Sequence, residues 1–277
     1  MGSLEMAALA GWHDALPELV SMIGKPGFAG RLDSALREVA PFDLSCAFAY
    51  PGRDRPMFLH DGLGAVSSTQ IMTNYLNGTY LLDAVYSACL RRAPQGLHRL
   101  ADLAPDAFFE GEYYNSPDVH PCISMESGTL AEEIVFLVPV QGSFYIAYSL
   151  LRANGSPAFR EKDFERLQRT APMVTSLAQR HWEHLAPAGS DSEPAQQPTG
   201  QDVEQAFETF APSRLTRREQ GIVSLILRGH SSMSIGRILE IAEGTVKIHR
   251  KHIYAKLDIS SQTELFNLFI KHLLAGR

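Results

Sequence analysis

The chain has 277 residues, a formal net charge of −6 and three cysteines. This length allows two domains, and no apolar run reaches the roughly 18 residues of a membrane span. The cysteines Cys46, Cys89 and Cys122 lack the spacing of a zinc or redox motif. Residues 1–20 lack the basic start and apolar core of a signal peptide. We therefore expect a cytoplasmic protein that contains no metal or cofactor and contacts no membrane.

Helix and strand patterns alternate along the first two thirds of the chain. Apolar residues at helical spacing predict helices over residues 12–23, 28–39, 67–76, 82–90, 107–115 and 159–185. Aromatic and β-branched runs between turn residues predict strands over residues 44–50, 55–60, 122–126, 133–140 and 143–152.

This order of elements suits one antiparallel sheet of about five strands flanked by helices, an α+β fold. We expect residues 1–185 to form an α-β-α sandwich of the GAF or PAS type. Such a layout commonly encloses a cavity for a small molecule between the sheet and the helices. The sequence therefore predicts a sensor domain for a small molecule.

A change in composition separates this unit from the rest of the chain. Residues 186–202 are rich in Pro, Gly, Ser and Gln, which predicts a flexible linker over residues 186–210. Residues 211–277 hold eleven Lys and Arg against five Asp and Glu, a net charge of +6. Residues 1–210 hold 14 against 26, a net charge of −12. The basic charge at the C-terminal end favours contact with nucleic acid there.

The C-terminal segment contains signals for successive short helices. Thr216 and Glu219 form a capping box ahead of a helix that ends at Gly229, which suits a left-handed cap. A short helix over residues 232–239 and a tight turn precede a third helix over residues 245–257, which has a basic face. This pattern is typical of a helix-turn-helix, whose second helix enters the major groove. A surface helix with solvated charges is the alternative, and the agreement of caps, turn and charge argues against it.

These residues resemble the four-helix DNA-binding domain of LuxR-type transcription regulators. The matching positions are Leu215, Thr216, Arg218, Glu219, Gly229, Ile235, Leu239, Thr245, Val246, Lys247, His249, Ile253, Lys256 and Leu257. The resemblance implies an all-α domain over residues 211–277 that binds double-stranded DNA. It also implies a homodimer contact on the last helix, through Leu265, Phe269 and Leu273. The residues expected at the DNA interface are Ser232, Ser234, Thr245, Val246, Lys247, His249, Arg250, Lys251 and Lys256.

Several positions depart from the family pattern, beginning with Ser232-Met233-Ser234, which stands where the family usually has an Asn-Lys-Glu-like run. Ala242 stands where a Ser would cap the recognition helix, Gly236 replaces a usual Ala, and Asp258 replaces a usual Gly. The missing cap lowers stability by about 1 kcal/mol. Asp accepts left-handed backbone geometry better than most residues, so we expect the fold to persist with modest stability.

An aromatic stretch over residues 71–114 is the second resemblance. Its tyrosines suit either half-buried core positions or the walls of a ligand pocket. Tyr75, Tyr80 and Asp83 resemble the Tyr, Tyr and Asp of the acyl-homoserine-lactone-binding domain of LuxR-type quorum sensors. In that family the Asp accepts a hydrogen bond from the ligand amide. The expected ligand-binding residues are Ile71, Tyr75, Tyr80, Asp83, Tyr86, His98, Tyr114 and Glu133.

The expected effector class follows from what this stretch lacks. Ile71 and His98 stand near positions where the family has pocket tryptophans, and the chain has only Trp12 and Trp182. We therefore expect a metabolite other than an acyl-homoserine lactone, as in LuxR-type regulators that lack a lactone synthase partner. Asp83, or Glu132 or Glu133 beside a strand, is suited to pair with an amine.

Other functions are alternatives to this interpretation. One is a true receptor for an acyl-homoserine lactone, and another is a regulator switched by phosphorylation or by a protein partner. A phosphate receiver needs an early acidic pair and a later Lys. The first 110 residues contain no adjacent acidic pair, and Lys25 is their only Lys. No Gly-rich phosphate loop, metal-spaced His/Cys cluster or Gly-x-Ser-x-Gly elbow is present, so we expect no catalytic site.

Overall fold

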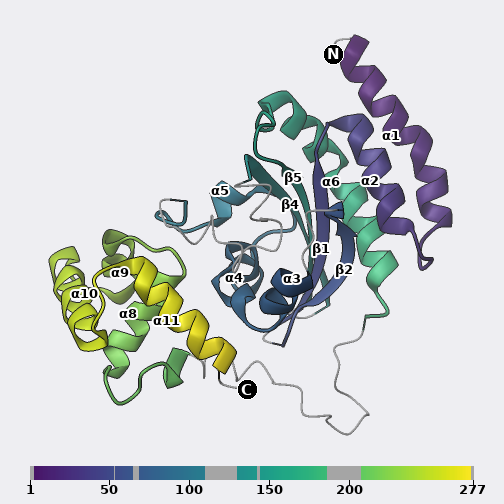
Figure 1. Cartoon of the computed structure of the whole chain (residues 1–277). Helices are drawn as coiled ribbons and strands as arrows, with labels where there is room; N and C mark the ends of the chain where they lie inside the picture. The colour runs from purple at the N-terminus through teal and green to yellow at the C-terminus, as the bar shows by residue number, and fades with distance from the viewer. Residues whose placement is uncertain are drawn as a thin grey trace, which may run out of the picture.

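The computed structural model describes residues 3–52, 54–64, 69–109, 130–141, 144–185 and 207–275. Figure 1 shows a sheet with helices on both faces and a separate group of helices that ends near the C-terminus. This arrangement confirms the expected combination of an α+β unit with an all-α helical unit.

The described part of the sheet has five strands in the order β2-β1-β5-β4-β3. Every neighbouring pair is antiparallel. The central strand β5 is buried along its whole length, because helices cover both faces of the sheet. The strands are β1 (Leu44–Pro51), β2 (Met57–Gly62), β3 (Gly96–Arg99), β4 (Glu132–Gln141) and β5 (Phe144–Arg152).

Alternation along the strands divides the apolar residues between two layers. The outer layer includes Phe136 and Tyr148 and packs against α1 (Ser3–Ser21), α2 (Phe28–Val39) and α6 (Glu161–Trp182). The inner layer includes Tyr50 and Leu137 and packs against α3 (Thr69–Leu76), the 3-10 helix η2 (Thr79–Leu82) and α4 (Ala84–Leu90). In Figure 1, α2 and α6 lie on one side of the sheet and α3 and α4 lie on the other.

The strands predicted over residues 44–50, 55–60, 133–140 and 143–152 are confirmed as β1, β2, β4 and β5. The pattern does not predict β3 or the adjacent helix α5 (Leu100–Leu103), because four residues are too few to show a period. Pairing with β4 holds β3 in place. Residues 107–109 form a turn rather than the start of the predicted helix. The strand predicted over residues 122–126 lies outside the described residues.

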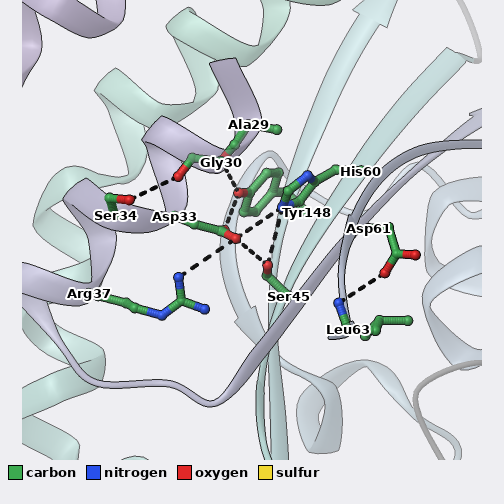
Figure 2. A network of polar contacts seen from close by, with 10 residues as sticks. All are labelled: Ala29, Gly30, Asp33, Ser34, Arg37, Ser45, His60, Asp61, Leu63 and Tyr148. Carbon is green, nitrogen blue, oxygen red and sulfur yellow. Dashed lines mark hydrogen bonds and ion pairs between the residues drawn. The ribbon is translucent and has the colours of Figure 1, made fainter. Parts of the chain in front are cut away.

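A buried polar network joins α2 to three strands (Figure 2). The carboxylate of Asp33 accepts hydrogen bonds from Ser45 Oγ at 2.5 Å and from His60 Nε2 at 3.0 Å. The Tyr148 hydroxyl donates to the other carboxylate oxygen. Burial alone raises the pKa of Asp33, but the hydrogen bonds from these partners outweigh it and hold the pKa below its ordinary value of 3.8. An ionised carboxylate therefore holds α2 against strands β1, β2 and β5.

Asp33, His60 and Ser45 are also the residue types of a hydrolase triad. In a triad the His bridges the Ser and the Asp with different ring nitrogens. Here His60 contacts both partners through Nε2, at 3.3 Å from Ser45 Oγ and 3.0 Å from Asp33. Ser45 is fully buried. The network therefore has a structural role.

The C-terminal unit consists of α8 (Arg217–Leu227), α9 (Ser232–Leu239), α10 (Glu243–Leu257) and α11 (Gln262–Ala275). The capping box of Thr216 and Glu219 is confirmed. Gly229 has the left-handed backbone expected after α8, with φ of 89°, and Asp258 has it after α10, with φ of 59°. Ala242 provides no side-chain cap for α10, as its residue type predicts.

Candidate DNA-binding and effector sites

The tight turn between α9 and α10 places the recognition helix on the domain surface. Glu240 takes left-handed backbone geometry in this turn. A Cβ on Gly236 would lie 2.8 Å from the Ile241 carbonyl oxygen, so the glycine permits the close approach of the turn to α9. Val246 and Ile253 are fully buried and fix one side of α10 against the core. The opposite side of α10 therefore faces solvent.

The exposed side of α10 carries part of the expected DNA interface. Thr245, Lys247 and Lys251 are exposed, and His249 is half-buried. Lys247 forms a 2.7 Å ion pair with Glu243, and the two side chains remain 66% and 41% exposed. Such a pair is weak, so Lys247 can exchange Glu243 for a phosphate or a base. Ile248 and His252 are also exposed and are absent from the expected set, although Ile248 lies three residues before Lys251 and four before His252, the spacing of one helix face.

Several of the residues expected at the DNA interface have contacts within the domain. Val246 is fully buried in the core. Arg250 donates hydrogen bonds to Ser232 Oγ at 3.3 Å and to Gln262 Oε1 at 2.8 Å, which ties α10 to α9 and α11. Ser234 lies 2.9 Å from His230 Nδ1 at the start of α9. In this conformation the side chains of Val246 and Arg250 hold the helices together, and a DNA contact through either residue remains a prediction.

Lys256 is likewise committed to a contact inside the domain. Its Nζ lies 2.7 Å and 2.8 Å from the two carboxylate oxygens of Glu219, which is buried. Burial alone raises the pKa of Glu219, but hydrogen bonds from Lys256 and Thr216 outweigh it and lower the pKa below 4.5. In this conformation Lys256 neutralises a buried acid while its side chain stays 41% exposed, and a DNA contact through it remains a prediction.

The residues expected at the dimer contact differ in their exposure. Leu265 and Phe269 are fully buried, and Phe269 stacks on Phe207 at a centroid distance of 4.5 Å. Both side chains pack inside the domain in this conformation, and a dimer contact through them remains a prediction. Leu273 is half-buried and lies near Gly78, where a Cβ would be 3.6 Å from its Cδ2.

A chain of hydroxyl groups ends at Asp83 on the inner face of the sheet. The Tyr75 hydroxyl donates to Asp83 Oδ2 at 2.6 Å, and the Tyr50 hydroxyl lies 2.6 Å from that of Tyr75. Because the Tyr75 proton points to Asp83, Tyr50 donates to Tyr75. Asp83 Oδ1 also accepts the Val85 backbone N–H and so caps α4. Burial raises the pKa of Tyr75 first, and the charge of Asp83 adds to it, so the phenol stays protonated.

Further aromatic and polar residues surround this chain. The rings of Tyr80 and Tyr86 meet edge to face at 4.9 Å. Thr79 has a buried hydroxyl that makes no hydrogen bond within the described ranges. Glu133 is buried on β4 opposite Leu151, on the strand face that also carries Val135 of the inner layer. The structure thus brings four expected residues, Tyr75, Tyr80, Asp83 and Tyr86, into one cluster and adds Tyr50.

The other expected ligand residues have different positions. Ile71 is half-buried on α3. His98 lies on the edge strand β3, where its Nε2 donates to the Pro94 carbonyl at 2.7 Å. Tyr114 lies outside the described residues. Trp12 and Trp182 both belong to the outer layer, so neither tryptophan lies on the inner face of the sheet.

A basic recognition helix on a helix-turn-helix, joined to an α+β unit, defines this chain as a DNA-binding transcriptional regulator. The profile of bacterial regulatory proteins of the luxR family matches residues 213–269. An HTH-type transcriptional regulator in the exeN 3' region of Aeromonas salmonicida is 37% identical over 147 residues, which cover 52% of this chain and 75% of that protein. The chain belongs to the luxR family.

Two further proteins show how the two units compare. The nitrate/nitrite response regulator NarL of Escherichia coli K12 is 42% identical over 52 residues, 19% of this chain and 24% of NarL. The crystal structure of the LBD domain of VqsR from Pseudomonas aeruginosa covers 61% of this chain and 95% of that domain. Its TM-score is 0.51 at 24% identity, which confirms the fold of the N-terminal unit alone.

Membrane contact is a separate question. Within the residues that the structure describes, none of the helices combines the length and apolar character of a membrane span.

Proposed function

We propose that this luxR-family regulator binds a small metabolite in its N-terminal unit and that binding controls promoter recognition by a homodimer. The observation that carries the proposal is the buried chain from Tyr50 through Tyr75 to Asp83. It places an acid among aromatic rings, between the end of η2 and the start of α4, the two short helices that cover the sheet. Ligand sites combine such apolar walls with a few fixed polar groups.

The ligand chemistry follows from the acid. A carboxylate can accept about four hydrogen bonds, so the bonds from Tyr75 and Val85 do not exclude a donor from a ligand. The partner that suits a buried anion is an N–H group, either an amide or a protonated amine. Glu133 on the same face of the sheet is a second acid for an amine. The inner face contains no tryptophan, so we infer that acyl-homoserine lactones are not the effector.

The phosphorylation alternative finds no support in the sheet. Receiver domains such as CheY belong to the doubly wound parallel folds. All strand pairs within the described residues are antiparallel. A small molecule or a protein partner therefore suits this unit better as the input than phosphorylation.

DNA recognition is proposed to use two copies of α10. Two recognition helices of a dimer read half-sites about 34–36 Å apart. Thr245, Lys247, Lys251 and Lys256 are the expected DNA contacts that remain exposed, and Ser232 and His249 are half-buried. If Lys247→Ala left specific binding intact at physiological salt, α10 would not be the recognition helix. The α11 surface still available to a second copy includes Asn267 and Lys271.

The effector proposal is tested by thermal unfolding of the full chain against amines, amides, amino acids, aromatic acids and acyl-homoserine lactones. A ligand at about 100 times its dissociation constant stabilises the native state by about 2.7 kcal/mol. We expect a hit among the amines or amides, and we expect Asp83→Asn and Glu133→Gln to weaken it.

The matched control is Asp102→Asn, which removes the same charge from an exposed position on α5. Unchanged affinity in both Asp83→Asn and Glu133→Gln would rule out this site. A hit with a lactone would show that the missing tryptophans are no guide to the effector.

A further inference from the structure

The N-terminal unit contacts the helix-turn-helix at the start of α9. Asp106 follows α5 in the chain, and its two carboxylate oxygens accept hydrogen bonds from the Ser231 side chain and from the Ser231 backbone N–H, the latter at 2.9 Å. The Ala107 N–H donates to the Gly229 carbonyl at 3.0 Å. Two of these three hydrogen bonds join residues 125 positions apart in sequence, and the third joins residues 122 positions apart (229 − 107).

Close packing accompanies these hydrogen bonds. Phe108 is 2% exposed and belongs to the same apolar cluster as Ile226 and Leu227 of α8. A Cβ on Gly229 would lie 2.8 Å from the Phe108 Cα, a distance that side chains do not tolerate. Glycine at this position thus serves both the left-handed end of α8 and the approach of Phe108. We call residues 106–108 with residues 229–231 the docking contact.

The docking contact places a negative charge at a helix start. Ser231 is the N-cap of α9, and its hydroxyl also accepts the Ser234 backbone N–H at 3.1 Å. Burial alone raises the pKa of Asp106, but the hydrogen bonds from Ser231 outweigh it and lower the pKa below 3.8. The carboxylate is therefore ionised. The positive end of the helix dipole favours this negative charge.

Phosphate oxygens of DNA favour the same position. In a helix-turn-helix the first helix crosses the DNA backbone, and helix N-termini are common donors to phosphate. A carboxylate and a phosphate cannot occupy the same Ser231 donors at once. We propose that Asp106 takes the place of a DNA phosphate at the start of α9, so that the docking contact holds the regulator in a state of low DNA affinity. This inference rests on the proposed DNA recognition and not on the identity of the effector.

The proposed effector cluster has a direct path to this contact. The Arg91 guanidinium at the end of α4 donates to the Leu103 carbonyl at 3.1 Å, just before residues 106–108. On the other side of the cluster, Gly78 precedes Tyr80 in the chain and lies beside Leu273 of α11. A shift of η2 or α4 around a ligand therefore reaches the helical unit at two places. A ligand that favours one arrangement changes the population of the docked state by its difference in affinity.

The test compares DNA binding of the full chain and three variants, measured by fluorescence anisotropy with a labelled duplex of mixed sequence. Asp106→Ala removes the carboxylate, and Phe108→Ala removes the packing without a change of charge. We expect both variants to bind DNA at least about fivefold more tightly than the wild type, the lower end of ordinary coupling between sites.

The matched control is Asp102→Ala, which removes an equal charge from the same segment at an exposed position. Asp102→Ala should bind as the wild type does. If Asp102→Ala tightened binding as much as Asp106→Ala, or if neither Asp106→Ala nor Phe108→Ala tightened it, the proposal would be overturned. If no form of the chain bound duplex DNA, the proposed DNA recognition would fail together with this inference.

Amide hydrogen exchange provides a readout that does not depend on a variant that folds. The Ser231 and Ala107 amides donate across the docking contact in the free protein. On saturation with the duplex, the Ala107 amide should exchange faster, because its acceptor on Gly229 moves away. An Ala107 amide that stayed protected in the DNA complex would show that docking and DNA binding coexist, and would overturn the proposal.

Discussion

Two buried aspartates on opposite faces of the sheet show how the same residue type serves different purposes. Asp33 on the outer face accepts three side-chain hydrogen bonds that join α2 to β1, β2 and β5. Asp83 on the inner face accepts a side-chain bond from Tyr75 and a backbone bond from Val85 of α4. Asp33 joins a long helix to three strands, whereas Asp83 lies between the short helices η2 and α4. Burial alone does not distinguish structure from function, but the elements that an acid joins do.

The comparison extends to two lysines of the DNA-binding unit. Lys256 neutralises the buried Glu219, whereas Lys251 is exposed on α10. One cation stabilises the fold, and the other is available to DNA. The predictions below separate these roles in both units.

The largest expected effect is on stability at Asp33. Asp33→Ala leaves the Ser45 hydroxyl, the His60 ring and the Tyr148 hydroxyl without their acceptor. We expect the free energy of unfolding to fall by about 3 kcal/mol, since each buried donor left unsatisfied costs about 1–3 kcal/mol. Urea denaturation checks this value. A loss smaller than about 1 kcal/mol would contradict the structural role of the network.

The pH dependence of the same network is the next effect. The folded-state pKa of Asp33 is lowered, so its stabilisation is complete above pH 3.8 and is lost as the pH falls through the folded pKa. Asp33→Asn should therefore cost about 2 kcal/mol at neutral pH and progressively less below pH 3.8. Denaturation of both proteins over a pH series checks the sign. A difference that grew on acidification would contradict it.

Asp83→Asn should change ligand binding more than it changes stability. Asparagine keeps an oxygen for the Val85 N–H, so the free energy of unfolding should change by about 1 kcal/mol or less. The loss of charge should weaken the proposed effector at least about tenfold, equal to about 1.4 kcal/mol. Calorimetric titration with the ligand found in the thermal panel measures this. If Asp33→Asn weakened the ligand as much as Asp83→Asn, the two acids would not have separate roles.

The smallest expected effects on stability distinguish Lys256 from Lys251. Lys256→Ala leaves Glu219 without its cation and should destabilise the chain by about 1 kcal/mol, a modest value because the lysine is partly exposed. Lys251→Ala should leave stability within about 0.5 kcal/mol and lower the slope of DNA affinity against salt by about one. Thermal unfolding and DNA titration over a salt series check the pair. Equal stability losses would contradict the assignment.

Local signals in the sequence predict local structure well. The capping box of Thr216 and Glu219, the left-handed Gly229 and the missing cap at Ala242 depend only on near neighbours, and all three are confirmed. Tyr50 lies two residues after Phe48 in a predicted strand. The two side chains therefore share one face of the sheet, the inner face. The longer strands of the sheet were predictable for the same reason, and they are confirmed as β1, β2, β4 and β5.

Contacts between distant residues are not predictable in this way. The positive charge of Lys256 indicates DNA as readily as it indicates Glu219, which lies 37 residues away. Apolar spacing on α11 predicts a buried face, but it does not say whether Phe269 packs in its own core or against a second copy. The bond between Asp106 and Ser231 depends on how two units meet, and no single segment contains that information.

The most direct test of the central claim is the DNA affinity of the full chain with and without the ligand found in the thermal panel. Fluorescence anisotropy of a labelled duplex, for the wild type and for Asp83→Asn, measures it. The account predicts that the ligand changes the wild-type dissociation constant by at least about fivefold and leaves that of Asp83→Asn nearly unchanged at the same ligand concentration. A ligand that stabilised the wild type but left its DNA affinity unaltered would contradict the account.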